Sequence, residues 1–449
     1  MSFRQPAAKQ RNRQAACAAA LCLLFYCGAP ATGQAAVSAG KVAMAKVPRA
    51  THFVVARGID LWQGKLLFRN IGVNIPDLFV RFLNGQDSSG DASLKDAQAA
   101  GVLLARCFGT VWSPDQFGIF MADRARWFGA FDRMLAAADA RGIGIVPSLL
   151  FNIRMIPDYV ASSSGGEEDL AAYLTPGTRA NNLAVEYVSA IVGRYKNDPR
   201  VLFWEIGNEY NLEADLSQQW KARPAGQAPT STQIINFLKQ MATLIHRIDK
   251  RHLVTSGNAD MRSEAWHMRQ AMLAHASQKS PMDYAMDWTP DTFPEYKEIL
   301  QEFNPAPIDI ISVHQYPPGN ETPYWLMPDD NLALVLPWTA LAAQEIGKPL
   351  FVGEFGEKVI VNGKPQPAAW TVNLMLRITA GAVPIGALWS WEYDETNPAQ
   401  APYSISPGRA PGLVSALGDD NHRIVADQLQ APVTTLKPRK SAAAPKPAK

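Results

Sequence analysis

Cysteine is scarce in this chain, with four residues among 449. Cys17, Cys22 and Cys27 lie in an N-terminal segment that we expect to be removed, and Cys107 is the fourth. Because Cys107 then has no partner, the mature chain is expected to form no intramolecular disulfide. Its stability must come from a large hydrophobic core, which a chain of this length with 47% hydrophobic residues can supply.

Net charge is also small. Its formal value is +2 at pH 7, and the excess of basic residues lies at the two ends of the chain. Because the net charge between the two ends is so small, the sequence offers no electrostatic basis for binding nucleic acid or an acidic membrane surface. We therefore expect neither partner.

Metal-ligand clusters and phosphate loops are missing from the sequence. No group of His, Cys, Asp and Glu residues has the spacing of a metal site, and no glycine-rich phosphate loop follows an expected strand. The sequence thus predicts a protein that needs neither a metal nor another cofactor.

Long apolar runs are absent as well. The run AACAAALCLLFYCGA at 15–29 ends before Pro30, which is short of the ~20 residues needed to span a bilayer. Four basic residues precede it between positions 4 and 13, and small residues follow. This layout predicts a signal peptide over 1–36, export to the periplasm or the medium, and no membrane span in the mature chain. An uncleaved anchor or a lipoprotein anchor at Cys27 is the alternative.

The remaining chain reads as one domain between two irregular ends. Residues 37–50 are expected to be a flexible lead-in, and residues 51–425 to form a single catalytic domain. Residues 426–449 include PVTTLKPRKSAAAPKPAK, which has almost no apolar content. This composition predicts a disordered Pro/Ala/Lys tail.

Short apolar runs alternate with segments of helical spacing along this domain, as in a parallel α/β sheet. The helical segments include 125–142, 184–196 and 231–250, while 53–68 is expected to form a hairpin that closes one end of the sheet. Eight such units favour a closed (β/α)₈ barrel, or TIM barrel, with elaborated βα loops. The eight expected strands are 66–74, 101–108, 142–151, 201–209, 252–258, 309–316, 349–356 and 385–393.

Two glutamates stand at the ends of apolar strands, where a barrel of this kind carries its active groups. Glu209 ends VLFWEIGNE and Glu354 ends PLFVGE. An acid in this position is often a helix-capping or solvated residue, but here Asn208 and Gly353 directly precede the two acids. The polar residues HQY at 314–316 end another expected strand, and Trp389 and Trp391 lie toward the end of a further one. Paired carboxylates from different strands, surrounded by such groups, indicate glycosidic-bond hydrolysis.

Four motifs in this region resemble glycoside hydrolase family five, the cellulase and β-mannanase family of clan A. YVSAIVGRYKNDPRVLFWEIGNEYN at 187–211 is similar to the fourth-strand region of that family, and SVHQY at 312–316 to its sixth-strand motif. FVGEFG at 351–356 resembles the nucleophile motif, and ALWSW at 387–391 the eighth-strand motif. The resemblance spans roughly residues 55–395 and again implies a (β/α)₈ barrel.

Roles for individual residues follow from the resemblance alone. It implies that Glu209 is the general acid/base and Glu354 the nucleophile. Asn208 would hydrogen-bond the sugar 2-hydroxyl beside the scissile bond. Arg106 would lie near Glu354 and help to keep it ionised, and Tyr316 would donate a hydrogen bond to the same carboxylate.

The resemblance also implies further substrate contacts, and this chain departs from the family at one of them. His314 resembles the substrate-contacting histidine of the family, and Trp389 the aromatic platform under the sugar at the cleavage point. Trp391 has the same strand parity and is the alternative platform. Where many members carry a histidine near the third strand, this chain has Asn152 in PSLLFN, a form similar to the mannanase-like branch.

The function expected from these features is that of a retaining, endo-acting β-glycosidase that cleaves β-mannan or β-glucan through a covalent glycosyl intermediate. The two carboxyl groups should then lie about 5–5.5 Å apart. Two alternatives remain open: an exo-acting glycosidase or transglycosylase with the same glutamates, and an inactive barrel that only binds carbohydrate. A polysaccharide or oligosaccharide is the expected partner, and we expect a monomer.

Overall fold

The computed structural model of the protein describes residues 52–164, 170–216, 229–275, 287–317 and 335–430. The expected signal peptide and the whole of the expected lead-in lie outside these residues. Among the residues that the structure describes, no helix combines the length and the apolar character needed to cross a membrane.

Eight parallel strands form the centre of the fold, in the spatial order β8-β7-β6-β5-β4-β13-β10-β9. A parallel bridge between Thr255 and Ile310 joins the two outer strands of this order, so the sheet closes on itself. Each strand lies within one of the eight expected segments, and the (β/α)₈ barrel is confirmed. The strands are β4 (Asn70–Asn74), β5 (Leu104–Phe108), β6 (Gly144–Leu150), β7 (Phe203–Gly207), β8 (Leu253–Thr255), β9 (Ile311–Gln315), β10 (Leu350–Phe355) and β13 (Ile385–Leu388).

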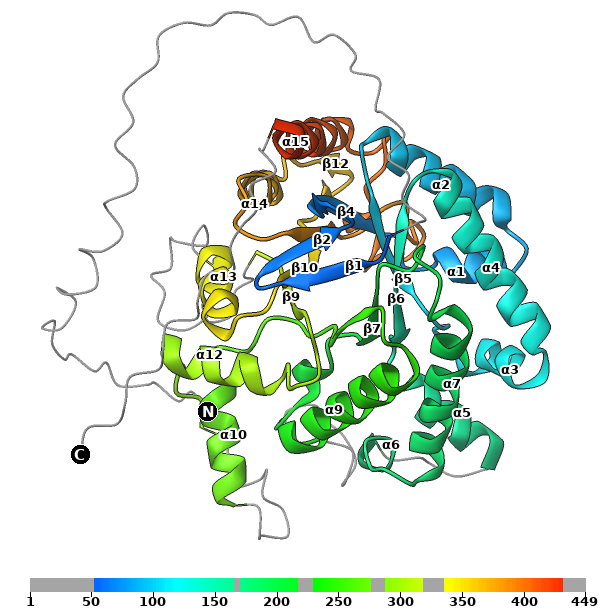
Figure 1. Ribbon diagram of the computed structural model, residues 1–449, viewed down its shortest axis with the longest axis vertical. Coiled ribbons are helices and arrows are strands. Elements are labelled where there is room, and N and C mark those ends of the chain that lie inside the picture. The colour runs from blue at the N-terminus through cyan, green and yellow to red at the C-terminus, as the bar shows by residue number, and fades with distance from the viewer. Residues whose placement is uncertain (1–51, 165–169, 217–228, 276–286, 318–334, 431–449) are drawn as a thin grey trace, which may run out of the picture. The chain divides into compact units, whose positions relative to one another are not determined.

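Helices surround the strands (Figure 1). The three helices expected from apolar spacing are present as α4, α7 and α9, and a capping box formed by Thr230 and Gln233 begins α9. The long connections at 153–181 and 259–306 carry short helices in their described parts. The helices are α1 (Leu78–Leu83), α2 (Asp87–Ala99), α3 (Pro114–Ala122), α4 (Arg124–Ala140), α5 (Met155–Ser164), α6 (Leu170–Tyr173), α7 (Arg179–Tyr195), η1 (Tyr210–Glu213), α9 (Ser231–Ile248), α10 (Ala265–Ala274), α12 (Phe293–Glu302), α13 (Val335–Ile346), α14 (Ala369–Thr379), η3 (Ala401–Tyr403) and α15 (Pro411–Gln430).

The expected hairpin closes the amino end of the barrel. It consists of β1 (Val54–Arg57), β2 (Asp60–Gln63) and β3 (Leu66–Leu67), paired antiparallel. Val54 and Leu61 from this hairpin pack in one buried cluster with barrel side chains that include Leu104, Phe203 and Phe351. Because this end is filled by apolar side chains, the open end of the barrel is the one formed by the carboxyl ends of the strands.

Alternation along β5 divides its side chains between the two sides of the sheet. Cys107 belongs to the core between the sheet and the helices, where its Sγ lies 3.9 Å from Sδ of Met134. Arg106, the preceding residue, contacts groups inside the barrel. Cys107 is thus a buried free cysteine that packs as a small hydrophobic residue.

The C-terminal helix corrects the expected boundary of the tail. Helix α15 continues to Gln430, so residues 426–430 belong to the folded domain, and residues 431–449 lie outside the described part. Asn421 attaches this helix to the barrel. Its Oδ1 accepts from Asn70 Nδ2 and the Ile71 amide, both at 2.9 Å, and its Nδ2 donates to the carbonyls of Ile71 and Ala100 at 3.0 and 3.2 Å.

Replacing Asn421 with alanine is expected to lower the free energy of unfolding by about 3 kcal/mol, because buried backbone groups lose their partners. Chemical denaturation of the two proteins measures the difference. Asp419→Ala, at an exposed position of the same helix, is the control. A loss no larger than that of the control would show that the contacts of Asn421 do not hold α15 to the barrel.

Candidate active site

A cavity of about 580 Å³ opens at the carboxyl ends of the barrel strands. Its volume lies within the ~300–1,000 Å³ typical of small-molecule sites, and its position is where barrels of this type carry their active groups. Both candidate catalytic glutamates face it. The lining residues are Phe108, Trp112, Phe151, Asn208, Glu209, Tyr316, Glu354, Trp389, Tyr393, Asp394, Asn397, Gln400 and Tyr403.

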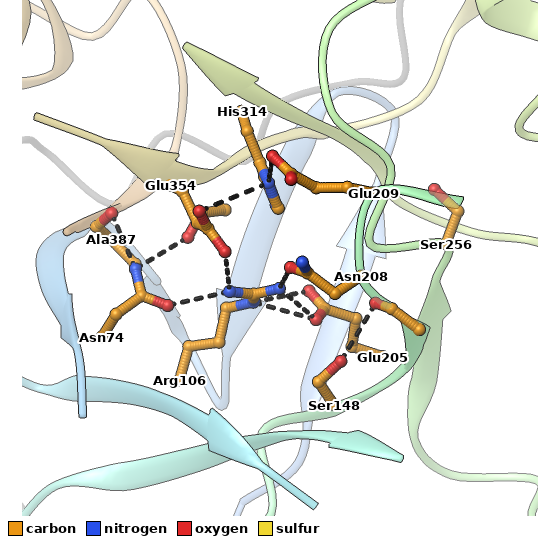
Figure 2. Close-up of polar contacts among 12 residues, drawn as sticks. Asn74, Arg106, Ser148, Glu205, Asn208, Glu209, Ser256, His314, Glu354 and Ala387 are labelled. Atoms are coloured by element: carbon orange, nitrogen blue, oxygen red, sulfur yellow. Dashed lines mark hydrogen bonds and ion pairs between the residues drawn. The ribbon is translucent and has the colours of Figure 1, made fainter. Parts of the chain in front are cut away.

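Glu209 follows β7 in a left-handed backbone conformation, with φ 55°. Its amide donates to the carbonyl of Gly257 at 2.8 Å, which fixes this unusual turn. The side chain is 31% exposed, and one carboxylate oxygen lies 2.9 Å from Nδ1 of His314. The turn at the strand end therefore directs this carboxyl into the cavity (Figure 2).

Burial raises the pKa of Glu209, and the nearby charge of Arg106 opposes this effect without cancelling it. A carboxyl with a raised pKa keeps its proton closer to neutral pH than an ordinary glutamate does. Glu209 thus has the protonation behaviour that a general acid needs.

His314 lies between the two glutamates on β9. Burial lowers the pKa of its imidazole to about 4, so the ring is neutral at ordinary working pH. Its Nδ1 is 2.9 Å from Glu209 and 3.6 Å from Glu354. A neutral ring next to Glu209 adds no charge that would remove the proton from the acid, and it can hydrogen-bond the carboxyl.

Glu354 ends β10 and is only 4% exposed. One carboxylate oxygen accepts from Arg106 and the other from the Tyr316 hydroxyl, each at 2.7 Å. Burial, followed by the charge of Glu354, raises the pKa of Tyr316 well above its ordinary value, so the phenol keeps its proton and donates. Both oxygens of Glu354 are therefore held by donors, which fixes the position of the carboxylate beside the cavity.

Gly353 is required by the close approach of β9. A Cβ at this position would lie 2.9 Å from Nε2 of His314. The Gly353 carbonyl accepts from Nδ2 of Asn74 at 3.0 Å, and the pairing of β10 with β9 shifts in register between Val352 and Glu354. The glycine before the second glutamate is thus explained by a close contact, as the sequence indicated.

Arg106 connects most of the polar groups beneath the cavity, as Figure 2 shows. Its guanidinium contacts Glu205 at 2.7 and 2.8 Å, Glu354 at 2.7 Å, Asn74 at 2.9 Å and Asn208 at 2.7 Å. Burial alone would lower the pKa of Arg106, but the two glutamates beside it raise that pKa above its ordinary value. The side chain is therefore a fixed positive charge with its position determined on all sides.

Two residues beside the catalytic pair contact Arg106. Oδ1 of Asn208 accepts the bond from Arg106, which leaves its Nδ2 donor for a ligand in the cavity. Glu205 is fully buried and paired with Arg106, which is the arrangement of a structural acid. The assignment of a substrate contact to Asn208 stays a prediction.

Trp389 lines the cavity, but Trp391 does not, and this resolves the choice between them. Trp391 is fully buried in the core between sheet and helices, and its indole N–H donates to the carbonyl of Ser93 at 3.2 Å. Shared strand parity suggested that both tryptophans face the same side. Strand β13 ends at Leu388, however, so the alternation does not extend to position 391.

The expected position of Asn152 is also corrected, because this residue does not line the cavity. Strand β6 ends at Leu150 and the next residue, Phe151, occupies the cavity wall. Asn152 stabilises the turn that follows: its Oδ1 accepts from the Arg154 amide at 3.0 Å, and its Nδ2 donates to the carbonyl of Trp112 at 3.2 Å. It therefore supports a neighbour of the cavity without contacting the space itself.

Most of the other lining residues were not predicted. They comprise an aromatic group after β5 and β6 and a polar group in the connection after β13. The strand-end positions of Phe108 and Phe151 could have indicated the first group. Nothing in the local sequence of the second group distinguishes it from an ordinary solvated loop.

Glu209, His314 and Glu354 are also the residues of the described chain that could hold a metal ion, since one ligand atom from each lies within 4.8 Å of the others. Both oxygens of Glu354 already accept bonds from Arg106 and Tyr316. The expectation that catalysis needs no metal stays a prediction.

The chain is similar in sequence to plant mannan endo-1,4-beta-mannosidases. Mannan endo-1,4-beta-mannosidase 2 from Oryza sativa subsp. japonica is 21% identical over 337 residues, which cover 67% of each protein. Mannan endo-1,4-beta-mannosidase 3 from the same plant is 23% identical over 294 residues, 59% of this chain and 54% of that protein. The chain thus spans about two thirds of the first relative and about half of the second.

Solved structures support the same fold. An endo-1,4-beta-mannanase from Rhizomucor miehei superimposes with a TM-score of 0.59 at 18% identity, over 83% of this chain and 99% of that one. A glycoside hydrolase family 5 mannosidase from the same fungus gives 0.58 at 14% identity, over 86% of this chain and all of that one. The sequence model of the cellulase family matches residues 166–395, just over half of the chain. The chain therefore belongs to the cellulase family, glycosyl hydrolase family 5.

Proposed function

We propose that the protein is a retaining β-glycosidase, with Glu354 as nucleophile and Glu209 as general acid/base. The observation that carries this proposal is the convergence of the two carboxyls from different strand ends, with a carboxylate oxygen of Glu209 within 4.8 Å of one of Glu354. Retaining enzymes place their carboxyls about 5–5.5 Å apart, and inverting enzymes about 6.5–9.5 Å apart. The short separation supports retention.

In the first step, a carboxylate oxygen of Glu354 forms a bond to the anomeric carbon while the bond to the leaving oxygen breaks. Glu209 transfers its proton to that oxygen, so the leaving sugar departs as a neutral alcohol. Arg106 and Tyr316 hold Glu354 on the opposite face of the sugar, and the site gains the positioning that such an attack requires.

In the second step, Glu209 is ionised and accepts a proton from water as the water oxygen attacks the anomeric carbon. The bond to Glu354 breaks, and the nucleophile returns as a carboxylate. Two displacements at the same carbon restore its original configuration. Asn208 is proposed to bond the sugar 2-hydroxyl throughout, through the Nδ2 that Arg106 leaves unused.

For the substrate we propose β-1,4-mannan cleaved within the chain. The names of the curated relatives and of the superimposed Rhizomucor miehei mannanase support this choice over β-glucan. Export is proposed as well, because basic residues precede an apolar run within the N-terminal segment at 1–36. N-terminal sequencing of the protein from the periplasm or medium should find a chain that begins near residue 36, and an intact Met1 would contradict export with cleavage.

Product release from a panel of β-mannans and β-glucans tests the activity. Wild type and Glu354→Gln are compared, and the anomer of the first product is recorded by proton NMR before mutarotation. We expect turnover of mannan with retained configuration, abolished in the variant. An inverted product would refute the proposed mechanism, and turnover confined to β-glucan would refute the proposed substrate.

The pH dependence should depend on Glu209. Since burial raises the pKa of this carboxyl, its proton is present at low pH and is lost as the pH rises through the raised value. Activity should therefore fall on the alkaline side, and Glu209→Gln should remove that limb from the kcat/KM profile. The variant should lose about 10²–10⁴-fold on substrates with poor leaving groups.

A dinitrophenyl glycoside is the matched control for this prediction, because its leaving group needs no proton. Glu209→Gln should form the glycosyl intermediate from it at nearly the wild-type rate. An equal loss on both kinds of substrate would contradict the role of Glu209 as the acid.

A further inference from the structure

The segment 389–394 follows β13 and carries two of the aromatic side chains that line the cavity, Trp389 and Tyr393. Between them, Glu392 has a φ of 48°, in the left-handed region that a residue with a side chain rarely adopts. Its carboxylate contacts Ser93 of α2 and does not line the cavity. Such a backbone conformation persists only where neighbouring groups hold it. The contacts of Glu392 therefore help to decide the direction of the two rings beside it.

A set of three residues, which we call the clamp, holds this position. It consists of Arg81 on α1, Ser93 on α2 and Glu392 itself. Nη2 of Arg81 donates to the main-chain carbonyl of Glu392 at 2.6 Å, and the Ser93 hydroxyl donates to the Glu392 carboxylate at 2.5 Å. Nη1 of Arg81 donates to Oγ of Ser93 at 2.8 Å, so the proton of that hydroxyl is directed to Glu392. Main chain and side chain of Glu392 are thus both bound, and both bonds depend on one guanidinium.

The two helical members of the clamp are themselves held in place. Arg81 is only 8% exposed, and an ion pair of 2.9 Å joins it to Asp77 at the start of the same helix. Ser93 is buried, and its carbonyl accepts from the indole N–H of Trp391 at 3.2 Å. Bonds to a charged group in a buried place are stronger than ordinary hydrogen bonds. The clamp therefore ties the segment 389–394 to two helices whose own residues do not line the cavity.

Main-chain bonds hold the same segment from other parts of the fold. The Trp389 amide donates to the carbonyl of Phe355 at 2.8 Å, and the Glu392 amide donates to the carbonyl of Ile405 at 2.9 Å. These bonds do not depend on which side chain stands at either position, so they remain when a clamp residue is replaced. A substitution in the clamp should thus displace the segment while the barrel around it stays folded.

We propose that Arg81 and Glu392 are positioning residues for the reaction, which fix the segment 389–394 so that Trp389 lies correctly against a sugar bound at the catalytic glutamates. Neither residue lines the cavity, so the effect must pass through the segment. A displacement of about 1 Å that arises outside the reaction centre can cost about 100-fold in rate, so such positioning matters for turnover. This inference rests on the proposed function, since it concerns the reaction assigned there.

A double-mutant cycle with Trp389 tests the path of the effect. Arg81→Met and Glu392→Ala are each expected to lower kcat/KM on β-1,4-mannan by about 10–100-fold. In the Trp389→Ala protein the same substitutions should cost little more, because the ring that they position is already gone. A loss that is as large in the Trp389→Ala protein as in the wild type would overturn the proposal, since the clamp would then act through the fold in general.

Two further variants separate positioning from loss of stability. Glu392→Gln keeps an oxygen that accepts from Ser93, so its kcat/KM should stay close to that of the wild type. Arg133→Met is the matched control, because Arg133 also donates to a main-chain carbonyl of α1, that of Phe82 at 2.8 Å, and pairs with Asp87 of α2 at 2.6 Å. It should lower stability without changing kcat/KM. A loss in Arg133→Met equal to that in Arg81→Met would contradict the proposal.

Hydrogen exchange separates this inference from the proposed function, because it needs no substrate. The main-chain amides of Trp389, Trp391 and Glu392 are hydrogen-bonded, so peptides that cover 389–394 should exchange slowly in the wild type. Mass spectrometry should find faster exchange of these peptides in Arg81→Met and Glu392→Ala, with peptides of α9 unchanged. Faster exchange in a protein whose wild type turns over no β-mannan or β-glucan would support the clamp and refute the proposed activity. Unchanged exchange of 389–394 would overturn the clamp, whatever the activity.

Discussion

Replacing Glu354 with alanine is expected to lower kcat by about 10⁵-fold, because the covalent intermediate can no longer form. The carboxylate is almost fully buried and held at both oxygens, so no neighbouring acid can take its position without moving Arg106 or Tyr316. Hydrolysis of a dinitrophenyl glycoside, followed at saturating substrate, measures the loss.

Azide provides the matching rescue experiment. In Glu354→Ala a small anion can occupy the space of the lost carboxylate and attack the anomeric carbon in a single displacement. The product should be a glycosyl azide of inverted configuration, whereas Glu209→Ala should give a retained azide through the intact intermediate. Retained azide from Glu354→Ala, or a loss smaller than about 100-fold, would assign the nucleophile to another group.

Much of the barrel could be predicted from the sequence because a strand buried on both faces has a distinctive composition. The segments around β5, β6 and β10 are nearly continuous apolar runs, and each ends in the residues that face the cavity. The carboxyl ends of parallel strands meet at one end of a barrel, so acids that end such runs must converge. This argument, together with Asn208 and Gly353 before the two acids and the polar and aromatic ends of other strands, indicated Glu209 and Glu354 without the family resemblance.

Other features could not be predicted from local sequence patterns, because they depend on where a strand ends or on contacts between distant parts of the chain. Trp391 has the parity of Trp389, but it lies three residues past the end of β13, where strand parity no longer decides the direction of a side chain. The contacts of Asn421 could not be predicted locally, because its partners lie more than 300 positions earlier in the chain. The lining residues after β13 can be recognised only once the fold places that connection at the cavity.

Arg106→Met is expected to lower the free energy of unfolding by about 3–5 kcal/mol, because it leaves the buried Glu205 and Glu354 without their positive partner. The variant should also lose about 10²–10³-fold in kcat/KM, the loss typical of removing one electrostatic donor from a catalytic site. Chemical denaturation measures the loss of stability, and steady-state kinetics of the same variant measure the loss of activity.

A second substitution can separate stability from catalysis in this network. Adding Glu205→Leu to Arg106→Met removes the other member of the buried pair, and replacing both ions with apolar side chains commonly restores stability. Because Glu354 still lacks its cation in the double variant, the unfolding free energy should recover only in part, while kcat/KM stays low. Recovery of both would mean that Arg106 acts only through folding. Recovery of stability without recovery of activity identifies Arg106 as the residue that positions the nucleophile.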